Sequence, residues 1–399
     1  MLKNALPERI ADHTDPGDES GGQLLQLIHR AICQADGWIG FDAFMALALY
    51  TPRLGYYARG SSQFGMLPAD ALRGGQGSEG SDFATAPEMT PLFGQTLATQ
   101  VAQALQATQT AEVWEFGAGT GALALQILDE LARQQVPVSR YTIVDLSGAL
   151  RARQQLRLAA HAETVRWVDA LPLQMQGVVI GNEVLDAMPV KLLTRNSATW
   201  FERGVALAKP AGTETPETPP TLCWADRATG LRPPADVPGP HDYLTEIHPQ
   251  AEAFIRTLAD RLTRGAAFFL DYGFPESEYY HPQRYMGTVM CHRQHRSDAN
   301  PLADVGLKDI TAHVNFTGTA VAAQEAGLEV LGYCTQARFL MNCGLLDRLD
   351  SARLQDKVIA QKLIMEHEMG ELFKVIGFQK AVAPWQPVGF VQGDRTHTL

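Results

Sequence analysis

The chain has 399 residues, of which 45% are hydrophobic and 19% are charged. This is the composition of a globular protein with a sizeable core, built as two or three domains or as one large α/β domain with additions. The formal net charge of −11 argues against duplex nucleic acid as the main partner, because phosphate binding requires a basic face.

Cysteine usage and the lack of targeting signals indicate a cytoplasmic bacterial protein. The five cysteines are odd in number, widely spaced and without a CxxC pair, which is typical of reduced thiols. No apolar run approaches the roughly 20 residues that cross a bilayer, so we expect no membrane segment. Residues 1–20 have no apolar signal core, and their acidic residues argue against a mitochondrial transit peptide. We interpret these residues as a disordered leader.

A helical N-terminal cap is predicted at residues 21–108. Helical periodicity runs through residues 23–35 and 41–50, and a further helix is expected at 91–107. Between these helices, residues 65–80 are rich in glycine and small side chains, which is typical of a flexible loop.

From residue 109 onward strands and helices alternate, which predicts an α/β fold with a parallel sheet. The expected strands are apolar runs within residues 111–116, 140–146, 164–170, 177–183, 265–273, 328–340 and 372–381. The many prolines of residues 205–249 indicate an insertion, so the core comprises residues 109–204 and 250–399. A helical insertion at 345–371 precedes the last strand.

The first strand of this core runs into the glycine-rich turn EFGAGTG. As G-x-G-x-x-A, the turn could hold a pyrophosphate at a helix N-terminus, with Asp145 as the ribose-binding acid of an NAD-dependent oxidoreductase. As E-x-G-x-G-x-G, formed by Glu115, Gly117, Gly119 and Gly121, it fits the nucleoside loop of class I methyltransferases. A carboxylate beside the loop suits the cationic end of S-adenosylmethionine and repels a pyrophosphate, which favours the methyltransferase. The oxidoreductase is kept as the alternative.

Acidic residues also end the second and third expected strands. Asp145 could accept hydrogen bonds from both ribose hydroxyls of a nucleoside, and Asp169 could accept one from an adenine amino group. A single acid at a strand end is more often a helix cap. Together with Glu115, however, these residues end three successive strands, which indicates one crevice at the carboxyl edge of the sheet.

Seven stretches of the chain are informative together, namely FMALALYTPRLGYY, DFATAPEMTPLFGQ, WEFGAGTGALA, LRARQ, GNEVLDAMPV, FLDYG and DITAHVNF. In them the chain resembles the MidA-type S-adenosylmethionine-dependent methyltransferases, which include the mitochondrial complex I assembly factor that methylates an arginine. The resemblance implies a class I methyltransferase, Rossmann-like fold with a seven-stranded, mostly parallel sheet, and S-adenosyl-L-methionine as cofactor. It also implies transfer to the guanidinium of a protein arginine, with a respiratory complex I subunit as a candidate partner.

At two places next to these stretches the chain departs from the family pattern. The family usually has Gly-Asp-Phe where this chain has Ser-Asp-Phe at residues 81–83, and a segment rich in Gly, Ala and Ser precedes it. After the second strand, the family's Glu-x-Ser-Pro is replaced by DLSG at residues 145–148. The carboxylate is retained but is one methylene shorter, so Asp145 and the adjacent Leu146 are still expected to contact the cofactor.

The fourth strand ends in GNEVLDAMPV, which places Asn182, Glu183 and Asp186 beside the core. Many class I methyltransferases present the group to be methylated at this position. Glu183 and Asp186 are spaced i, i+3 and could face the same way, so that two carboxylates hold a guanidinium. Asn182 could contact either the cofactor or the acceptor. Alternatively, Asp186 caps a helix and Glu183 pairs with an internal arginine such as Arg151 or Arg195.

Two further loops are candidates for closing the site. In DITAHVNF, His313 and Asn315 could bring a polar ring over the acceptor pocket, although a histidine satisfied within the core is the more common case. In DFATAPE, which precedes the first strand of the sheet, Thr85 and Pro87 could belong to a lid over the cofactor or to a helix start.

The histidine-rich segment at residues 281–297 is not expected to bind a metal. It holds His281, Cys291, His292 and His295 but lacks the second ligand pair of a metal site, so we interpret it as a basic, mobile loop. A third hypothesis for the whole chain is a non-catalytic assembly factor that binds the cofactor only for stability. The sequence leaves the oligomeric state open, with a homodimer as one option.

Overall fold

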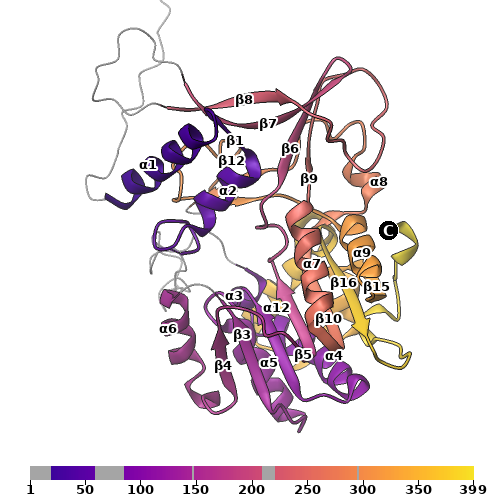
Figure 1. The fold of residues 1–399 in the computed structure, drawn as a ribbon. Helices are drawn as coiled ribbons and strands as arrows, with labels where there is room; N and C mark the ends of the chain where they lie inside the picture. The colour runs from indigo at the N-terminus through magenta and orange to yellow at the C-terminus, as the bar shows by residue number, and fades with distance from the viewer. Residues whose placement is uncertain (1–18, 59–84, 146–147, 209–220, 294–295) are drawn as a thin grey trace, which may run out of the picture.

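The computed structural model describes most of the chain, namely residues 19–58, 85–145, 148–208, 221–293 and 296–399. A large sheet with helices on both faces forms the lower part of the molecule in Figure 1, and a smaller antiparallel sheet with two helices lies above it. Most of the predicted leader, the whole predicted loop 65–80, Leu146 and His295 lie outside the described residues.

The large sheet has the strand order β15-β16-β10-β5-β2-β3-β4, with the short strand β14 paired beside β10. Strands β4 to β10 along this order run parallel, whereas β16 is antiparallel to both of its neighbours. The mostly parallel sheet is as predicted, but β14 makes it eight-stranded where seven strands were expected. Its members are β2 (Glu112–Phe116), β3 (Arg140–Val144), β4 (Val165–Val168), β5 (Met175–Asn182), β10 (Leu262–Phe274), β14 (Val314–Asn315), β15 (Glu329–Thr335) and β16 (Phe373–Lys380).

The central strands are buried on both faces, which explains their continuous apolar sequences. Val178, Val179 and Ile180 of β5 are fully buried, and so are Phe268 and Phe269 of β10. Parallel strands need crossover connections, and these place helices over both faces of the sheet.

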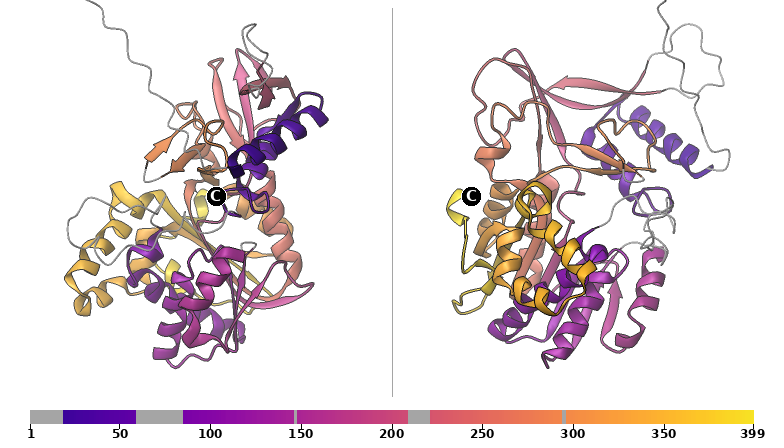
Figure 2. Two further views of the ribbon diagram at one scale, coloured as in Figure 1. Left: turned by 90° about the vertical axis from the view of Figure 1, so that its left-hand side faces the viewer. Right: turned by 180° about the vertical axis from the view of Figure 1, so that it is seen from behind.

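Helices pack on the two faces of the large sheet in two groups (Figure 2). One face packs against α4 (Leu92–Thr108), α5 (Ala122–Arg133), α10 (Gln336–Asn342), α11 (Leu345–Ser351) and α12 (Leu354–Ile364). The other face packs against α7 (Pro249–Arg261) and α9 (Phe316–Glu325). Although the sequence placed α4 in the N-terminal cap, its buried side chains, such as Leu97 and Val101, belong to the core of the large sheet.

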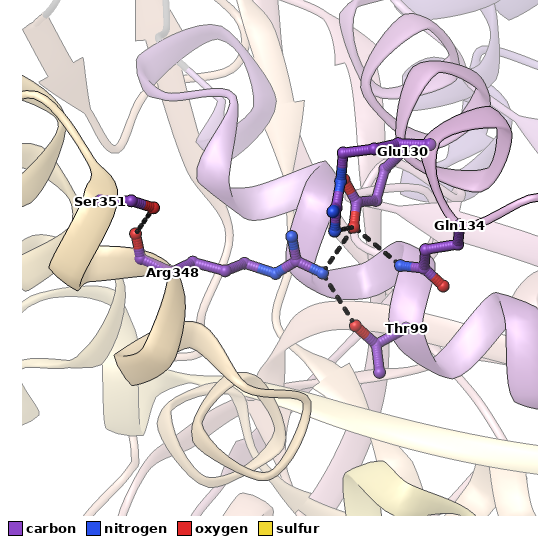
Figure 3. A network of polar contacts seen from close by, with 6 residues as sticks. Thr99, Glu130, Gln134, Arg348 and Ser351 are labelled. Atoms are coloured by element: carbon purple, nitrogen blue, oxygen red, sulfur yellow. Dashed lines mark hydrogen bonds and ion pairs between the residues drawn. The ribbon is translucent and has the colours of Figure 1, made fainter.

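An ion cluster around the buried Glu130 fixes α11 to α5 and α4 (Figure 3). The Arg348 guanidinium lies 2.9 Å from Glu130 Oε1 and donates to Thr99 Oγ1 at 3.1 Å. Arg133 and Gln134 also donate to Glu130, at 2.6 and 2.7 Å. Burial alone raises the pKa of Glu130, but the hydrogen bonds from Arg133, Gln134 and Arg348 outweigh it and lower the pKa to about 2. The start of the predicted helical insertion 345–371 is therefore anchored to the core.

The smaller sheet joins strands from distant parts of the chain. Its order is β1-β7-β6-β9, with β8 also paired to β7, and α1 (Glu19–Gln34) and α2 (Phe41–Tyr50) pack against it. The predicted insertion 205–249 thus contains regular strands, and the predicted boundary at residue 204 falls inside β7. The strands are β1 (Trp38–Gly40), β6 (Lys191–Asn196), β7 (Thr199–Leu207), β8 (Leu222–Ala228) and β9 (Tyr243–Ile247).

Short elements complete the described chain. Three of them form a small antiparallel sheet of order β12-β11-β13. In the part that the structure describes, no helix combines the length and the apolar character needed to cross a bilayer. The short elements are α3 (Ala86–Met89), α6 (Gly148–Arg157), η2 (Ala159–His161), α8 (Glu276–Tyr279), β11 (Met290–Arg293), β12 (Arg296–Asp298), β13 (Asp309–Thr311), η3 (Glu366–Gly370), η4 (Val388–Phe390) and η5 (Thr396–Thr398).

Candidate active site

A cavity of about 830 Å³ lies at the carboxyl ends of β2, β3, β4 and β5, between the large sheet and α2. This edge of a parallel sheet is where ligands bind in α/β folds. Ten of the residues predicted from the sequence line the cavity, namely Thr85, Pro87, Glu115, Gly117, Gly119, Asp145, Asp169, Asn182, Glu183 and Asp186.

The glycine-rich turn between β2 and α5 forms one wall of the cavity. Gly117 and Gly119 have positive φ angles of 62° and 52°, a conformation that favours glycine. A Cβ on Gly117 would lie 3.1 Å from Val184 Cγ2, whereas one on Gly119 would project into open space. The backbone at Gly119 is therefore accessible to a ligand. Gly121 is the N-cap of α5, so it shapes the turn without lining the cavity.

The segment before the sheet is tied to this turn. Arg157 of α6 donates to Glu88 Oε1 at 2.9 Å and to Thr120 Oγ1, and the Thr120 hydroxyl donates to Glu88. Thr85 is the N-cap of α3, and both Thr85 and Pro87 line the cavity. The expected helix start is therefore present, and it also borders the cavity, whereas the lid over the cofactor stays a prediction.

Glu115 at the end of β2 is buried and accepts a hydrogen bond of 2.7 Å from the Tyr141 hydroxyl. Burial raises the pKa of Glu115 to about 7, although the hydrogen bond from Tyr141 opposes the shift. A carboxyl with such a pKa ionises readily when a cation binds beside it. The position therefore suits the cationic group that is predicted there from the sequence.

Gln154 of α6 organises the neighbouring wall, and sequence reasoning missed it. Its side chain is fully buried and donates to the Gly119 carbonyl at 2.8 Å and to Asp145 Oδ2 at 2.9 Å. Its amide oxygen accepts from Trp167 Nε1 at 2.8 Å. One buried amide thus fixes the glycine turn relative to the ends of β3 and β4. The one sequence signal for Gln154 is that it belongs to the stretch LRARQ.

Asp169 lines the cavity from the end of β4, where it is largely exposed and pairs with Arg151. Arg195 donates to the backbone carbonyls of Val237 and His241. Both arginines that the sequence offered as internal partners of Glu183 are therefore engaged elsewhere. The alternative in which Glu183 forms a buried pair with one of them is wrong.

Glu183 and Asp186 follow β5 and face the cavity together. Glu183 has a φ of 55°, and its side chain accepts from Asn182 Nδ2 at 3.1 Å and from the Ala86 backbone N–H. Burial, followed by the charge of Asp186, raises the pKa of Glu183 to about 8. Burial also raises the pKa of Asp186 to about 6. A left-handed glutamate is strained, and such strain concentrates at functional sites.

Two buried oxygens in this group lack a hydrogen-bond donor among the described residues, Oδ1 of Asn182 and Oδ1 of Asp186. Buried polar atoms are normally satisfied, because leaving one without a partner costs about 1–3 kcal/mol. Since both residues line the cavity, these oxygens are in place to accept from a bound ligand.

Asp271 of β10 holds the loop that carries these residues, and sequence reasoning missed it as well. Its Oδ2 accepts from the backbone N–H groups of Val184, Leu185 and Asp186 at 3.1, 2.8 and 3.2 Å. Burial, with the charges of Asp186 and Glu183, raises the pKa of Asp271. The side chain does not line the cavity, so it positions the loop from behind.

The electrostatic character of the cavity is acidic throughout. No Lys, Arg or His occurs among the described residues that line it. Such a lining attracts cations and repels a pyrophosphate, which argues against the dinucleotide alternative. The carboxyl-bearing residues in the lining are Asp42, Glu88, Glu115, Asp145, Asp169, Glu183, Asp186 and Asp309.

His313 does not line the cavity. Its ring packs against those of Tyr272 and Phe274, each at 5.2 Å between centroids. Burial, with the charges of Arg284 and Lys374, lowers the pKa of His313 to about 4, so it is neutral. The expected position of this ring over the acceptor pocket is therefore not found. Asn315 in the same stretch caps α9, with Oδ1 accepting from the Gly318 N–H at 3.2 Å.

The histidine-rich segment forms part of the three-stranded sheet. Cys291 is buried in β11, His292 follows it, and His281 is exposed in the preceding loop. Within the described ranges, no three His, Cys, Asp or Glu side chains are grouped as metal ligands.

The chain is similar to known proteins along most of its length. A family model described as "Putative S-adenosyl-L-methionine-dependent methyltransferase" matches residues 96–334. A solved structure from Burkholderia thailandensis with S-adenosyl-homocysteine bound is 46% identical, covers 95% of this chain and 97% of its own, and has a TM-score of 0.85. A second structure from that organism, of an uncharacterized protein, is 45% identical with a TM-score of 0.82.

More distant relatives carry a more specific description. "Protein arginine methyltransferase NDUFAF7 homolog, mitochondrial" of Caenorhabditis elegans is 25% identical over 86% of this chain and 83% of its own length. The human "Protein arginine methyltransferase NDUFAF7, mitochondrial" is 25% identical over 85% of this chain and 80% of its own length.

Proposed function

Since the chain belongs to the S-adenosyl-L-methionine-dependent methyltransferase family whose model matches it, we propose that it methylates a guanidinium nitrogen of a protein arginine. S-adenosyl-L-methionine is its cofactor. The observation that carries the proposal is the carboxyl pair Glu183 and Asp186, which shares a cavity with the glycine turn and includes a buried oxygen without a partner. The arginine methyltransferase relatives support the same acceptor.

In this proposal the glycine turn and the strand ends hold the cofactor. S-adenosyl-L-methionine supplies a methyl group on a positively charged sulfonium. Glu115 meets its ammonium end, Asp145 accepts from the ribose hydroxyls, and Asp169 accepts from the adenine amino group. The open side of Gly119 lets the backbone lie against the ligand. These assignments fit the acidic lining, because a cationic ligand favours the charged form of the buried Glu115 carboxyl.

Gln154→Ala should weaken binding of S-adenosyl-L-homocysteine by roughly tenfold, because two hydrogen bonds that shape the site are lost. Titration calorimetry measures this directly. Gln100→Ala is the matched control, since Gln100 is also fully buried and accepts from the Gly389 N–H at 2.8 Å, but its partners Gly389 and Gln103 do not line the cavity, whereas Gly119 and Asp145 do. Equal affinities for the Gln154 variant and wild type would contradict a role for Gln154 in cofactor binding.

Glu183 and Asp186 orient the acceptor. A guanidinium is planar and carries five donors, so two carboxylates on one side can hold it while one nitrogen remains directed at the methyl group. Most of the rate then comes from alignment of the reacting atoms. Because the pKa of Glu183 is about 8, its carboxylate can also take up the proton that the nitrogen loses after transfer.

The raised pKa values predict a pH dependence for transfer. Glu183 and Asp186 must be ionised to hold a cation, and their pKa values are about 8 and about 6. At subsaturating acceptor, the initial rate should therefore rise with pH from about 6 to about 8 and then level off. Labelling with methyl-labelled cofactor at a series of pH values measures this profile. A rate that falls across the same interval would contradict the need for ionised carboxylates.

The proposed activity is tested by labelling an extract from cells that lack this protein. Purified protein and methyl-labelled S-adenosyl-L-methionine are added, and the labelled protein is hydrolysed to identify the modified amino acid. Methylarginine that is lost with Glu183→Gln supports the proposal, and a labelled subunit of respiratory complex I would identify the partner that the family resemblance suggests. Label in another amino acid or in small molecules contradicts it.

A further inference from the structure

The cavity has an aromatic wall that sequence reasoning did not identify. Tyr50 ends α2, and Tyr57 follows a turn that is closed by a hydrogen bond of 2.9 Å from the Tyr57 N–H to the Leu49 carbonyl. The two rings stack with 5.6 Å between their centroids and 28° between their planes. Both tyrosines line the cavity, and so does Asp309 of β13, which lies more than 250 residues further along the chain.

The hydroxyl hydrogens of both tyrosines are already used. The Tyr57 hydroxyl donates to Asp309 Oδ1 at 2.7 Å, and the Tyr50 hydroxyl donates to the Ala187 carbonyl at 2.8 Å. Burial, together with the charges of Asp309 and Asp186, raises the pKa of both phenols, so they stay neutral. Each phenol oxygen can therefore act towards a cavity ligand only as an acceptor.

Asp186 supplies an independent indication that a ligand binds at this corner. Its side chain is 4% exposed, and its Oδ1 has no donor among the described residues. It precedes Ala187, whose carbonyl accepts from the Tyr50 hydroxyl, and it lines the same cavity as Tyr50 and Tyr57. A buried carboxylate oxygen that lacks a partner, next to two phenol acceptors and a second carboxylate, indicates a ligand with several N–H donors.

We propose that Tyr50, Tyr57 and Asp309 form a specificity wall that selects a planar guanidinium over a lysine ammonium; this inference rests on the proposed function. A guanidinium spreads five donors over one plane and stacks on aromatic rings, so it can use the flat wall and the separate acceptors together. An ammonium is a compact, strongly hydrated charge with three donors, so it gains less from the wall and loses more water on entering.

Binding of two small probes tests the wall without knowledge of the natural acceptor. Propylguanidinium and propylammonium are titrated into the protein saturated with S-adenosyl-L-homocysteine, and wild type should prefer propylguanidinium by on the order of tenfold. Tyr57→Phe and Asp309→Asn should bring this ratio close to one and leave the affinity for S-adenosyl-L-homocysteine unchanged. Tyr243→Phe is the matched control, because the buried Tyr243 donates to the His281 carbonyl at 3.1 Å outside the cavity.

The outcomes separate this inference from the proposed function. Methylarginine in the labelled extract, together with an unchanged probe ratio in Tyr57→Phe and Asp309→Asn, overturns the wall but leaves the arginine activity standing. Label in an amino acid other than arginine, with no preference for propylguanidinium in wild type, overturns both. A preference that is lost in the two variants and retained in Tyr243→Phe supports the wall. Thermal melting of each variant shows whether a lost preference reflects unfolding.

Discussion

Glu183→Gln should reduce methyl transfer by about 100-fold or more, because a neutral amide cannot hold a cation as a carboxylate does. The same substitution should leave binding of S-adenosyl-L-homocysteine intact and make the unliganded protein more stable. At pH 8 we expect a gain of about 1–2 kcal/mol, limited because the side chain is partly exposed and screened by solvent. Labelling rates, calorimetry and chemical denaturation measure the three effects.

The gain in stability should depend on pH in a defined direction. The pKa of Glu183 rises from 4.5 in an ordinary environment to about 8 in the folded protein. Below the lower value the carboxyl is neutral in both states and carries no charge penalty. As the pH rises towards 8, the unfolded chain releases its proton while the folded protein retains it, so wild type loses stability. The difference between Glu183→Gln and wild type should therefore widen between about pH 5 and pH 8.

A buried glutamate outside the cavity provides the control. Glu246 accepts from the backbone N–H groups of Thr288 and Val289 at 2.7 and 3.2 Å and from the Tyr279 hydroxyl at 2.9 Å. Because these donors face its carboxyl, Glu246→Gln should destabilise the protein while transfer continues. A Glu183→Gln variant that transfers methyl at the normal rate would remove Glu183 from the proposed mechanism.

Asp271→Ala should lower the free energy of unfolding by about 3 kcal/mol or more, because three backbone N–H groups, two of them buried, lose their shared acceptor. The groups belong to Val184, Leu185 and Asp186, so the loop that presents the acceptor carboxylates should also lose its shape. Transfer should therefore fall more than cofactor affinity does. Chemical denaturation measures the stability, and labelling together with calorimetry separates the two functional effects.

Asp298→Ala serves as the comparison for Asp271→Ala. Asp298 lies on the exposed strand β12, outside the cavity, where it pairs with the buried Lys308 at 2.7 Å. Lys308 keeps the Asn300 carbonyl at 3.4 Å and Asp304 Oδ2 at 3.9 Å, so this variant should lose about 1–2 kcal/mol, less than Asp271→Ala, and should retain its activity. If Asp271→Ala were as stable as Asp298→Ala, the three backbone hydrogen bonds would not be holding the loop.

The large sheet could be predicted because its signals are local. Each strand is an apolar run such as Val178 to Ile180, and each crossover helix has its own periodicity over a dozen residues. The strand-end acids could be predicted for the same reason, since parallel strands bring their carboxyl ends to one edge. Glu115, Asp145 and Glu183 therefore line one cavity as expected.

The smaller sheet could not be predicted, because its strands give weak local signals and pair over long distances. Strand β8 is largely exposed and follows a proline-rich stretch, so its sequence favours a loop. Strand β1 has three residues, and its partner β7 lies in another part of the chain. Tyr57 and Asp309 meet in the cavity through such long-range packing, which no spacing in the sequence indicates.

The stretch that holds His313 reaches the cavity, but through a residue other than the predicted histidine. The backbone of this loop does approach the cavity, since the Ala312 N–H donates to the Asp186 carbonyl at 2.9 Å. The His313 side chain, however, packs behind Tyr272, while Asp309 at the start of the same stretch lines the cavity. Strand β13 pairs with β11, whereas β14 pairs with β10, so the chain passes from one sheet to another between Asp309 and His313. The motif therefore identifies the loop but not which of its residues faces the ligand.

Strand β1 pairs with β7, with Trp38 opposite Ala206. During synthesis, this partner is therefore made 168 residues after β1, the difference between 206 and 38. At roughly 5–20 residues per second, ribosomes need on the order of ten seconds for this length. During that interval α2 has emerged, but the strands on which it packs have not all been made. A nascent chain that ends before β7 already contains the glycine turn. Helix α2, which carries Tyr50, is not yet packed on its complete sheet. The complete cavity is a late product of translation, and chains released early should be unable to retain an acceptor.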